Sequence, residues 1–112
     1  MYEYKATLLR VIDGDTVDCL IDLGFDVILR ERVRLINIDA PETRTKDLQE
    51  KKWGLEAKER LQTLLDRYPY FIVKTTLHKG KFGRTLGELF LQDGLNINET
   101  LIQEGFAERY DD

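Results

Sequence analysis

The fold is decided by residues 5–41, KATLLRVIDGDTVDCLIDLGFDVILRERVRLINIDAP. Three β-compatible runs follow one another in this stretch, at residues 5–12, 16–22 and 27–38. The dipeptide Asp13-Gly14 separates the first two runs and is a strong hairpin-turn signal. Gly24 follows the second run, and Pro41 stops the third because proline cannot donate to a strand ladder. The stretch therefore predicts three consecutive strands.

The run at residues 27–38 has two different faces when it is read with the period of two of a strand. One face carries Val27, Leu29, Glu31, Val33, Leu35 and Asn37. The other carries Ile28, Arg30, Arg32, Arg34, Ile36 and Ile38, so three arginines occupy successive positions on it. We expect Arg34 to have a function, and Arg30 and Arg32 to be solvated surface charges.

The remainder of the chain adds two helices and two strands. Residues 43–52 are polar and predict a surface loop, and the apolar spacing of residues 54–67 predicts a helix. Strands are expected at residues 70–77 and 85–91, and a short helix at residues 98–104 ends at Gly105. This order predicts a mainly β fold with helices (α+β), built as a small antiparallel barrel with helices packed at its ends.

Composition excludes several classes of protein. The chain has 112 residues, 42% hydrophobic and 34% charged, which is typical of one globular domain, expected to span residues 1–112. It contains no apolar run long enough for a membrane helix. The N-terminal residues lack the pattern of a secretory signal, so a cytoplasmic location is expected unless a leader was removed. The single Cys19 can form no internal disulfide.

Charge is distributed unevenly along the chain. Seventeen Lys and Arg against twenty-one Asp and Glu give a net charge of −4. Five basic residues and no acidic residue nevertheless fall between positions 67 and 87: Arg67, Lys74, Lys79, Lys81 and Arg84. The net charge argues mildly against a nucleic-acid partner, whereas the local basic patch favours one.

Three short motifs contain the residues suited to chemistry: Asp13-Gly14-Asp15-Thr16, residues 34–43 (RLINIDAPET) and Lys81-Phe82-Gly83-Arg84. Their carboxylates are hard oxygen ligands, and a site that includes no His or Cys suits Ca²⁺ better than zinc. Their arginines can clamp a phosphate. A cation, a carboxylate that activates water and paired arginines are what phosphodiester hydrolysis requires.

Together, in this order, the motifs resemble the staphylococcal nuclease (thermonuclease) family, from about Ala6 to Ala107. The resemblance implies a five-stranded OB-fold barrel with about two helices. It also implies a hydrolase: a Ca²⁺-dependent endonuclease that cuts DNA and RNA with little sequence specificity and leaves 3′-phosphates. The chain stops at Asp112, where the family's C-terminal helix is expected to be missing.

The resemblance also implies a metal site. Asp15 and Asp39 would be the carboxylate ligands, and the main-chain carbonyl of Ala40 would be a third ligand. Asp13 would support these ligands without touching the ion. Ca²⁺ is the implied cation, and Mg²⁺ or Mn²⁺ is possible in a small site made only of oxygen ligands.

The remaining implied roles concern the substrate. Glu42 would orient or deprotonate the attacking water, while Arg34 and Arg84 would bind the scissile phosphate and its transition state. Lys81 and Phe82 would contact the substrate. Phe82 replaces a tyrosine of the family's well-known member, so stacking is retained and a hydrogen-bond donor is lost.

Three functions remain open from the sequence. The leading one is a monomeric nuclease that acts on single-stranded or frayed DNA or on RNA. The second is a non-catalytic OB-fold module that binds nucleic acid or protein. The third is an enzyme for a small phosphodiester, which the short, acidic C-terminus motivates.

Overall fold

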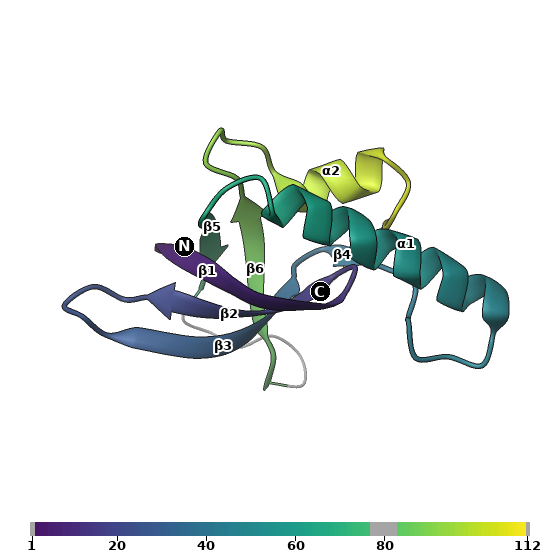
Figure 1. Ribbon diagram of the computed structural model, residues 1–112, viewed down its shortest axis with the longest axis horizontal. Coiled ribbons are helices and arrows are strands. Elements are labelled where there is room, and N and C mark those ends of the chain that lie inside the picture. Colours follow the sequence, from purple (N-terminus) through teal and green to yellow (C-terminus); the bar gives the residue numbers. More distant parts are fainter. Residues whose placement is uncertain (1, 77–82, 112) are drawn as a thin grey trace.

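A computed structural model describes residues 2–76 and 83–111, and its main feature is a closed five-stranded barrel (Figure 1). Around the barrel the strands follow the order β1-β2-β3-β6-β5. They are β1 (Tyr2–Asp13), β2 (Thr16–Asp22), β3 (Ile28–Leu35), β5 (Phe71–Thr75) and β6 (Thr85–Phe90). The helices α1 (Leu48–Leu65) and α2 (Ile97–Gln103) pack against it. The expected five-stranded barrel with two helices is confirmed.

Two features of the sheet differ from expectation. The barrel is not wholly antiparallel, because β3 and β6 pair in parallel, with Val33 opposite Thr85. A second, two-stranded sheet joins β4 (Ile38–Asp39) to β7 (Glu108–Arg109), which the sequence did not predict. Strands of two residues carry too little alternation to be recognised from sequence.

The prediction of one strand over residues 27–38 is wrong. Strand β3 ends at Leu35, and the chain turns at Asn37, whose φ of 66° lies in the left-handed region that asparagine tolerates. The turn resets the alternation, so Ile38 is 1% exposed and no longer shares a face with Arg30 and Arg32. The turn therefore directs β4 across the end of the barrel (Figure 1).

Helix α1 begins earlier than predicted, and the prediction of a loop over residues 43–52 is wrong from Leu48 onward. The Asp47 side chain caps the helix by accepting hydrogen bonds from the main-chain N–H groups of Gln49 and Glu50, at 3.0 and 3.2 Å. The cap sets this end, whereas the apolar spacing used for the prediction begins only at Ala57, nine residues after Leu48.

The other boundaries agree with the sequence to within a few residues in the described part of the chain. Gly105 ends α2 as predicted, with a φ of 81° directly after the capping Glu104. The turn expected at Lys79-Gly80 lies outside the described residues. No helix in residues 2–76 and 83–111 is long and apolar enough to cross a bilayer.

Close packing of α1 fixes the two segments that carry the predicted site residues. A Cβ on Gly14, in the β1–β2 turn, would lie 2.6 Å from the Ala57 Cβ of α1. A Cβ on Gly54 of α1 would lie 2.5 Å from the main-chain oxygen of Glu42. Both glycines are therefore required for space, and Gly14 does not adopt the left-handed conformation that a type I′ hairpin turn would need.

Candidate active site

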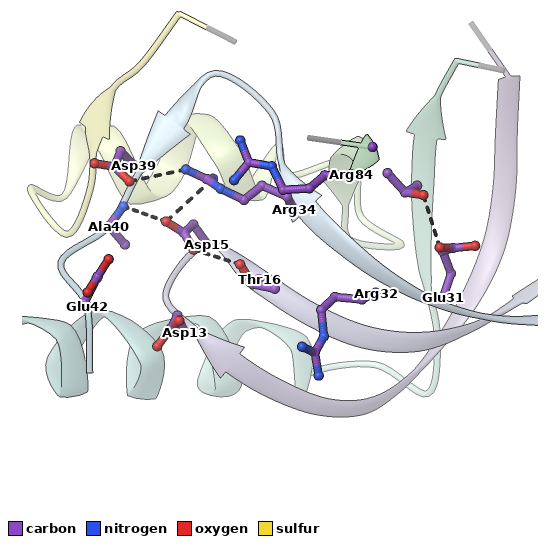
Figure 2. Close-up of a pocket in the computed structure, with 12 residues that line it drawn as sticks. Asp13, Asp15, Thr16, Glu31, Arg32, Arg34, Asp39, Ala40, Glu42 and Arg84 are labelled. Carbon is purple, nitrogen blue, oxygen red and sulfur yellow. Dashed lines mark hydrogen bonds and ion pairs between the residues drawn. The ribbon is translucent and has the colours of Figure 1, made fainter. Parts of the chain in front are cut away.

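A pocket of about 470 Å³ lies where the β1–β2 turn, β3, β4 and the start of β6 meet (Figure 2). It gathers every predicted site residue that the structure describes: Asp13, Asp15, Arg34, Asp39, Ala40, Glu42 and Arg84. Lys81 and Phe82 lie outside the described residues. Three parts of the chain that are distant in sequence, residues 13–16, 31–42 and 83–85, thus supply one pocket.

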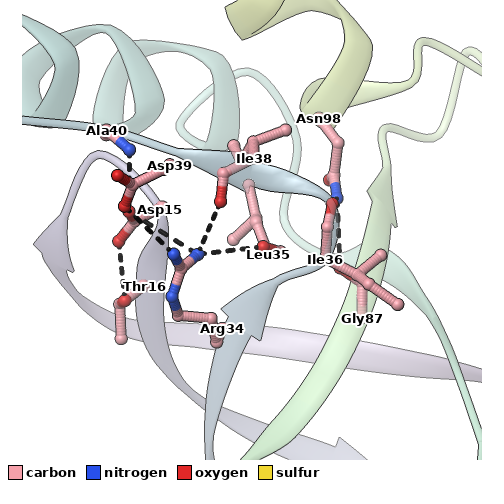
Figure 3. Close-up of polar contacts among 10 residues, drawn as sticks. All are labelled: Asp15, Thr16, Arg34, Leu35, Ile36, Ile38, Asp39, Ala40, Gly87 and Asn98. Carbon is pink, nitrogen blue, oxygen red and sulfur yellow. Dashed lines mark hydrogen bonds and ion pairs between the residues drawn. The ribbon is translucent and has the colours of Figure 1, made fainter. Parts of the chain in front are cut away.

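Asp15 is a buried carboxylate in the β1–β2 turn, with only 6% of its surface exposed. It accepts hydrogen bonds from the Thr16 hydroxyl and the Ala40 main-chain N–H, both at 2.9 Å (Figure 3). Burial raises the pKa of Asp15 above its usual range, although the Ala40 N–H and Arg34 oppose this effect. A positive charge in the pocket would therefore favour the ionised form.

Arg34 on β3 is a buried cation of the pocket, and its guanidinium is held by several hydrogen bonds. Its Nη1 donates to the main-chain oxygens of Leu35 and Ile38, at 3.1 and 2.9 Å (Figure 3). Its Nη2 donates to Asp39 at 3.2 Å, and Nη1 lies 3.5 Å from Asp15. The carbonyl of Ile38 lies beyond the turn at Asn37. Its hydrogen bond with Arg34 therefore stabilises the turn and also holds the Arg34 side chain in place.

Asp39 and Glu42 are the accessible carboxylates. The Asp39 side chain is 57% exposed, and Glu42 is exposed in the segment after β4. That segment is held from two sides: its main chain packs on Gly54, and Thr43 donates to Asp13 at 2.6 Å. Asp13 therefore helps to hold the segment that carries Glu42, through its hydrogen bond with Thr43.

Arg84 reaches the pocket because β3 and β6 are parallel. It precedes Thr85, which pairs with Val33 of β3, and it is partly buried. The Thr85 hydroxyl also donates to Glu31 of β3, at 3.1 Å. The parallel pairing therefore places Arg84 next to the part of β3 that carries Arg34, although fifty positions separate these arginines in the sequence.

The residues present fit a hard divalent cation. Asp15 and Asp39 both contact Arg34, so their carboxylates converge, and the main chain of Ala40 lies beside Asp15. The ligands of the predicted site, two carboxylates and a main-chain carbonyl, are all oxygen atoms, as Ca²⁺ and Mg²⁺ require. No group of three acidic, His or Cys side chains arranged to hold a metal occurs in the described part of the chain. The predicted site needs only two carboxylates and a carbonyl.

The sequence reasoning missed two residues near the site. Arg32, expected to be a solvated charge, lines the pocket and pairs with the buried Asp18. Asn98, read only as part of a helix, is 3% exposed and donates to the carbonyl of Ile36, in the turn between β3 and β4. The alternate positions of the three arginines on β3 were a sequence signal for Arg32. Its pairing with Asp18 could be seen only once the register of β2 and β3 was known.

Known proteins resemble this chain over most of its length. The family model described as staphylococcal nuclease homologue matches residues 32–112. An endonuclease, YhcR, of Bacillus subtilis is 33% identical over 96% of this chain, which covers 9% of that protein. An uncharacterized endonuclease of Escherichia coli O157:H7 is 29% identical over 97% of this chain and 63% of its own length. Protein ParB of Escherichia coli is 30% identical over 96% of this chain and 58% of its own. The family match and the five-stranded barrel together show that this chain belongs to the staphylococcal nuclease homologue family.

Proposed function

We propose that this chain is a metal-dependent nuclease that hydrolyses phosphodiester bonds of DNA or RNA. One observation carries the proposal: the carboxylates of Asp15, Asp39 and Glu42 share a pocket with Arg34 and Arg84. Membership in the family supports it, as do the relatives named endonucleases. Because the chain spans less than two thirds of these relatives, the proposal concerns the chain itself.

The metal would be held by the carboxylates of Asp15 and Asp39 and by the main-chain carbonyl of Ala40. Ca²⁺ is the proposed ion, with Mg²⁺ or Mn²⁺ as possible substitutes. When bound, a divalent cation neutralises charge on a phosphate oxygen. Thr16 and the Ala40 N–H hold the Asp15 carboxylate in a fixed orientation before any ligand arrives.

Glu42 is the proposed general base. Its exposed carboxylate lines the pocket and can accept a proton from a water molecule that attacks phosphorus. The P–O5′ bond then breaks, the 5′ oxygen takes up a proton, and the products are a 3′-phosphate and a 5′-hydroxyl. Packing of the Glu42 main chain on Gly54 keeps this carboxylate at the pocket.

The two arginines would bind the scissile phosphate. Two main-chain carbonyls fix the plane of the Arg34 guanidinium before substrate binds, so little reorganisation is needed as negative charge develops. Arg84, the residue before β6, lines the same pocket. Guanidinium groups suit this role because they donate two parallel hydrogen bonds to phosphate.

Digestion of denatured DNA with Ca²⁺ and with chelator tests the proposal. The wild type should cut only with the metal, and Glu42→Gln should lose about 10²–10⁴-fold in rate. Glu59→Gln, a change of an exposed glutamate on α1 outside the pocket, is the matched control and should cut normally. The products should have 3′-phosphate ends that block extension by a polymerase. DNA that is bound but never cut in any divalent metal would identify a binding module instead.

A further inference from the structure

Three charged side chains form a row on the outer face of three neighbouring strands beside the pocket. Arg32 of β3 donates two hydrogen bonds to the carboxylate of Asp18 of β2, from Nε at 2.7 Å and from Nη2 at 3.1 Å. Arg10 of β1 approaches the same carboxylate at 3.3 Å. Asp18 is almost fully buried between these arginines, and Arg32 holds the pKa of Asp18 down at about 2. The row therefore carries one net positive charge.

The ion pair with Asp18 orients Arg32 and leaves some of its N–H donors available. Its guanidinium has five N–H donors, and Asp18 takes two of them. The side chain is 57% exposed and lines the same pocket as Arg34, on the side of Thr16 away from Asp15 in Figure 2. Arg32 and Arg34 are two residues apart on one strand, so roughly 6.6 Å separates their Cα atoms.

The opposite side of the pocket repels phosphate. A larger groove of about 1000 Å³ adjoins it, shares Asp39 and Glu42 with it, and runs between α1 and the segment after α2. Its lining includes seven carboxylates: Asp39, Glu42, Asp47, Glu50, Glu56, Glu104 and Glu108. No Lys or Arg is among the described residues that line this groove. A polyanion that leaves the pocket toward α1 would therefore enter a groove whose described charged residues are all acidic.

We propose that Arg32, oriented by Asp18 and Arg10, binds the phosphate next to the scissile phosphate, so that the preferred substrate is a strand with several phosphates. The inference rests on the proposed nuclease function and specifies its substrate class. Arg32 contacts substrate, whereas Asp18 and Arg10 are positioning residues. The strand runs over the outer face of β3 and away from the acidic groove.

Substrates that differ by one phosphate test this proposal. The dinucleotide TpT has only the scissile phosphate, and pTpT and TpTp add one phosphate on the 5′ or 3′ side. Wild type should cut one of the longer pair with a lower KM than TpT. Arg32→Gln should raise KM for that substrate about tenfold and should raise KM for TpT by a smaller factor. Arg30→Gln is the matched control, because Arg30 is exposed on the same strand face and does not line the pocket.

A binding measurement separates this proposal from the nuclease proposal. Anisotropy of a labelled single strand, with Glu42→Gln protein to prevent cutting, should show weaker binding after Arg32→Gln. The slope of log K against log salt should also become shallower by about 0.7. Equal binding with and without Arg32, or an equal loss of activity on TpT and the longer substrates, overturns the inference. A wild type that cuts nothing overturns the nuclease proposal, while the binding result still decides the role of Arg32.

Asp18→Asn distinguishes orientation from charge. This change adds one positive charge to the row, so a purely electrostatic contribution of Arg32 predicts tighter binding of the single strand. An asparagine keeps only one acceptor oxygen, so loss of one of the two hydrogen bonds that orient Arg32 predicts weaker binding, which is the result expected here. Arg10→Gln gives a second test, because it removes charge but leaves both Arg32–Asp18 hydrogen bonds in place. It should weaken binding less than Arg32→Gln, and the reverse order would overturn the inference.

Discussion

Asn98 is a buried polar residue that connects three parts of the fold, and its replacement by alanine should be strongly destabilising. Its side-chain oxygen accepts from the Leu89 N–H at 3.1 Å. Its side-chain nitrogen donates to the carbonyls of Ile36 and Gly87, at 3.0 and 3.2 Å (Figure 3). One side chain thus ties α2 to β6 and to the turn between β3 and β4.

The expected loss of unfolding free energy depends on which hydrogen bonds the partners of Asn98 keep in the alanine variant. The Gly87 carbonyl retains a hydrogen bond from the Ile36 N–H at 2.9 Å, whereas Leu89 and Ile36 lose the bonds that Asn98 makes with them. Two buried hydrogen bonds and one partly buried hydrogen bond, at about 1 kcal/mol each with a further penalty for partners left without a bond, give a loss of about 3–4 kcal/mol.

Urea unfolding of wild type, Asn98→Ala and Asn96→Ala measures this loss. Asn96 caps the same helix by accepting from the Glu99 N–H, and its replacement should cost about 1 kcal/mol. The Asn98 variant should therefore show the larger fall in unfolding free energy by at least about 2 kcal/mol. Equal losses at the two asparagines would refute the view that Asn98 holds the turn through buried hydrogen bonds.

Three further predictions concern pH, packing and thiol chemistry. Because the pKa of Asp18 is about 2 when folded and near 3.8 when unfolded, its ion pair stabilises the protein above pH 4. This stability, at most about 2 kcal/mol after screening, should disappear as pH falls from about 4 to 2 in urea titrations, and Asp18→Asn should lack this component. Gly54→Ala should lower both Tm and cleavage rate, since its Cβ would meet the Glu42 oxygen at 2.5 Å; a normal rate would contradict that contact. Burial raises the pKa of Cys19 to about 12, so iodoacetamide should modify it only after unfolding, and rapid labelling of folded protein would contradict this burial.

Sequence motifs located the candidate site better than they located its supports. Asp15, Asp39, Glu42, Arg34 and Arg84 were identified from short motifs, because their residue types are unusual together. The structure places all of them on one pocket. Their assigned roles remain predictions, which the Glu42→Gln and Arg32→Gln experiments address.

The predicted strand and helix boundaries that were wrong are those that a single residue sets. Asn37 ended a strand whose apolar alternation continued past it, and Asp47 began a helix before its apolar spacing was visible. Periodicity reports which residues face the core, whereas a turn or a cap depends on one local hydrogen bond or one unusual φ.

The sequence by itself determined the barrel class, the two helices and the residue types at the site, because alternation, turn residues and motifs are local properties of the chain. Only the tertiary structure decided that β3 and β6 pair in parallel, which brings Arg84 to Arg34. It also decided that Asp18 orients Arg32 and that Asn98 supports the turn at Asn37. These contacts join residues far apart in sequence, so they depend on strand register and burial, which no local pattern specifies.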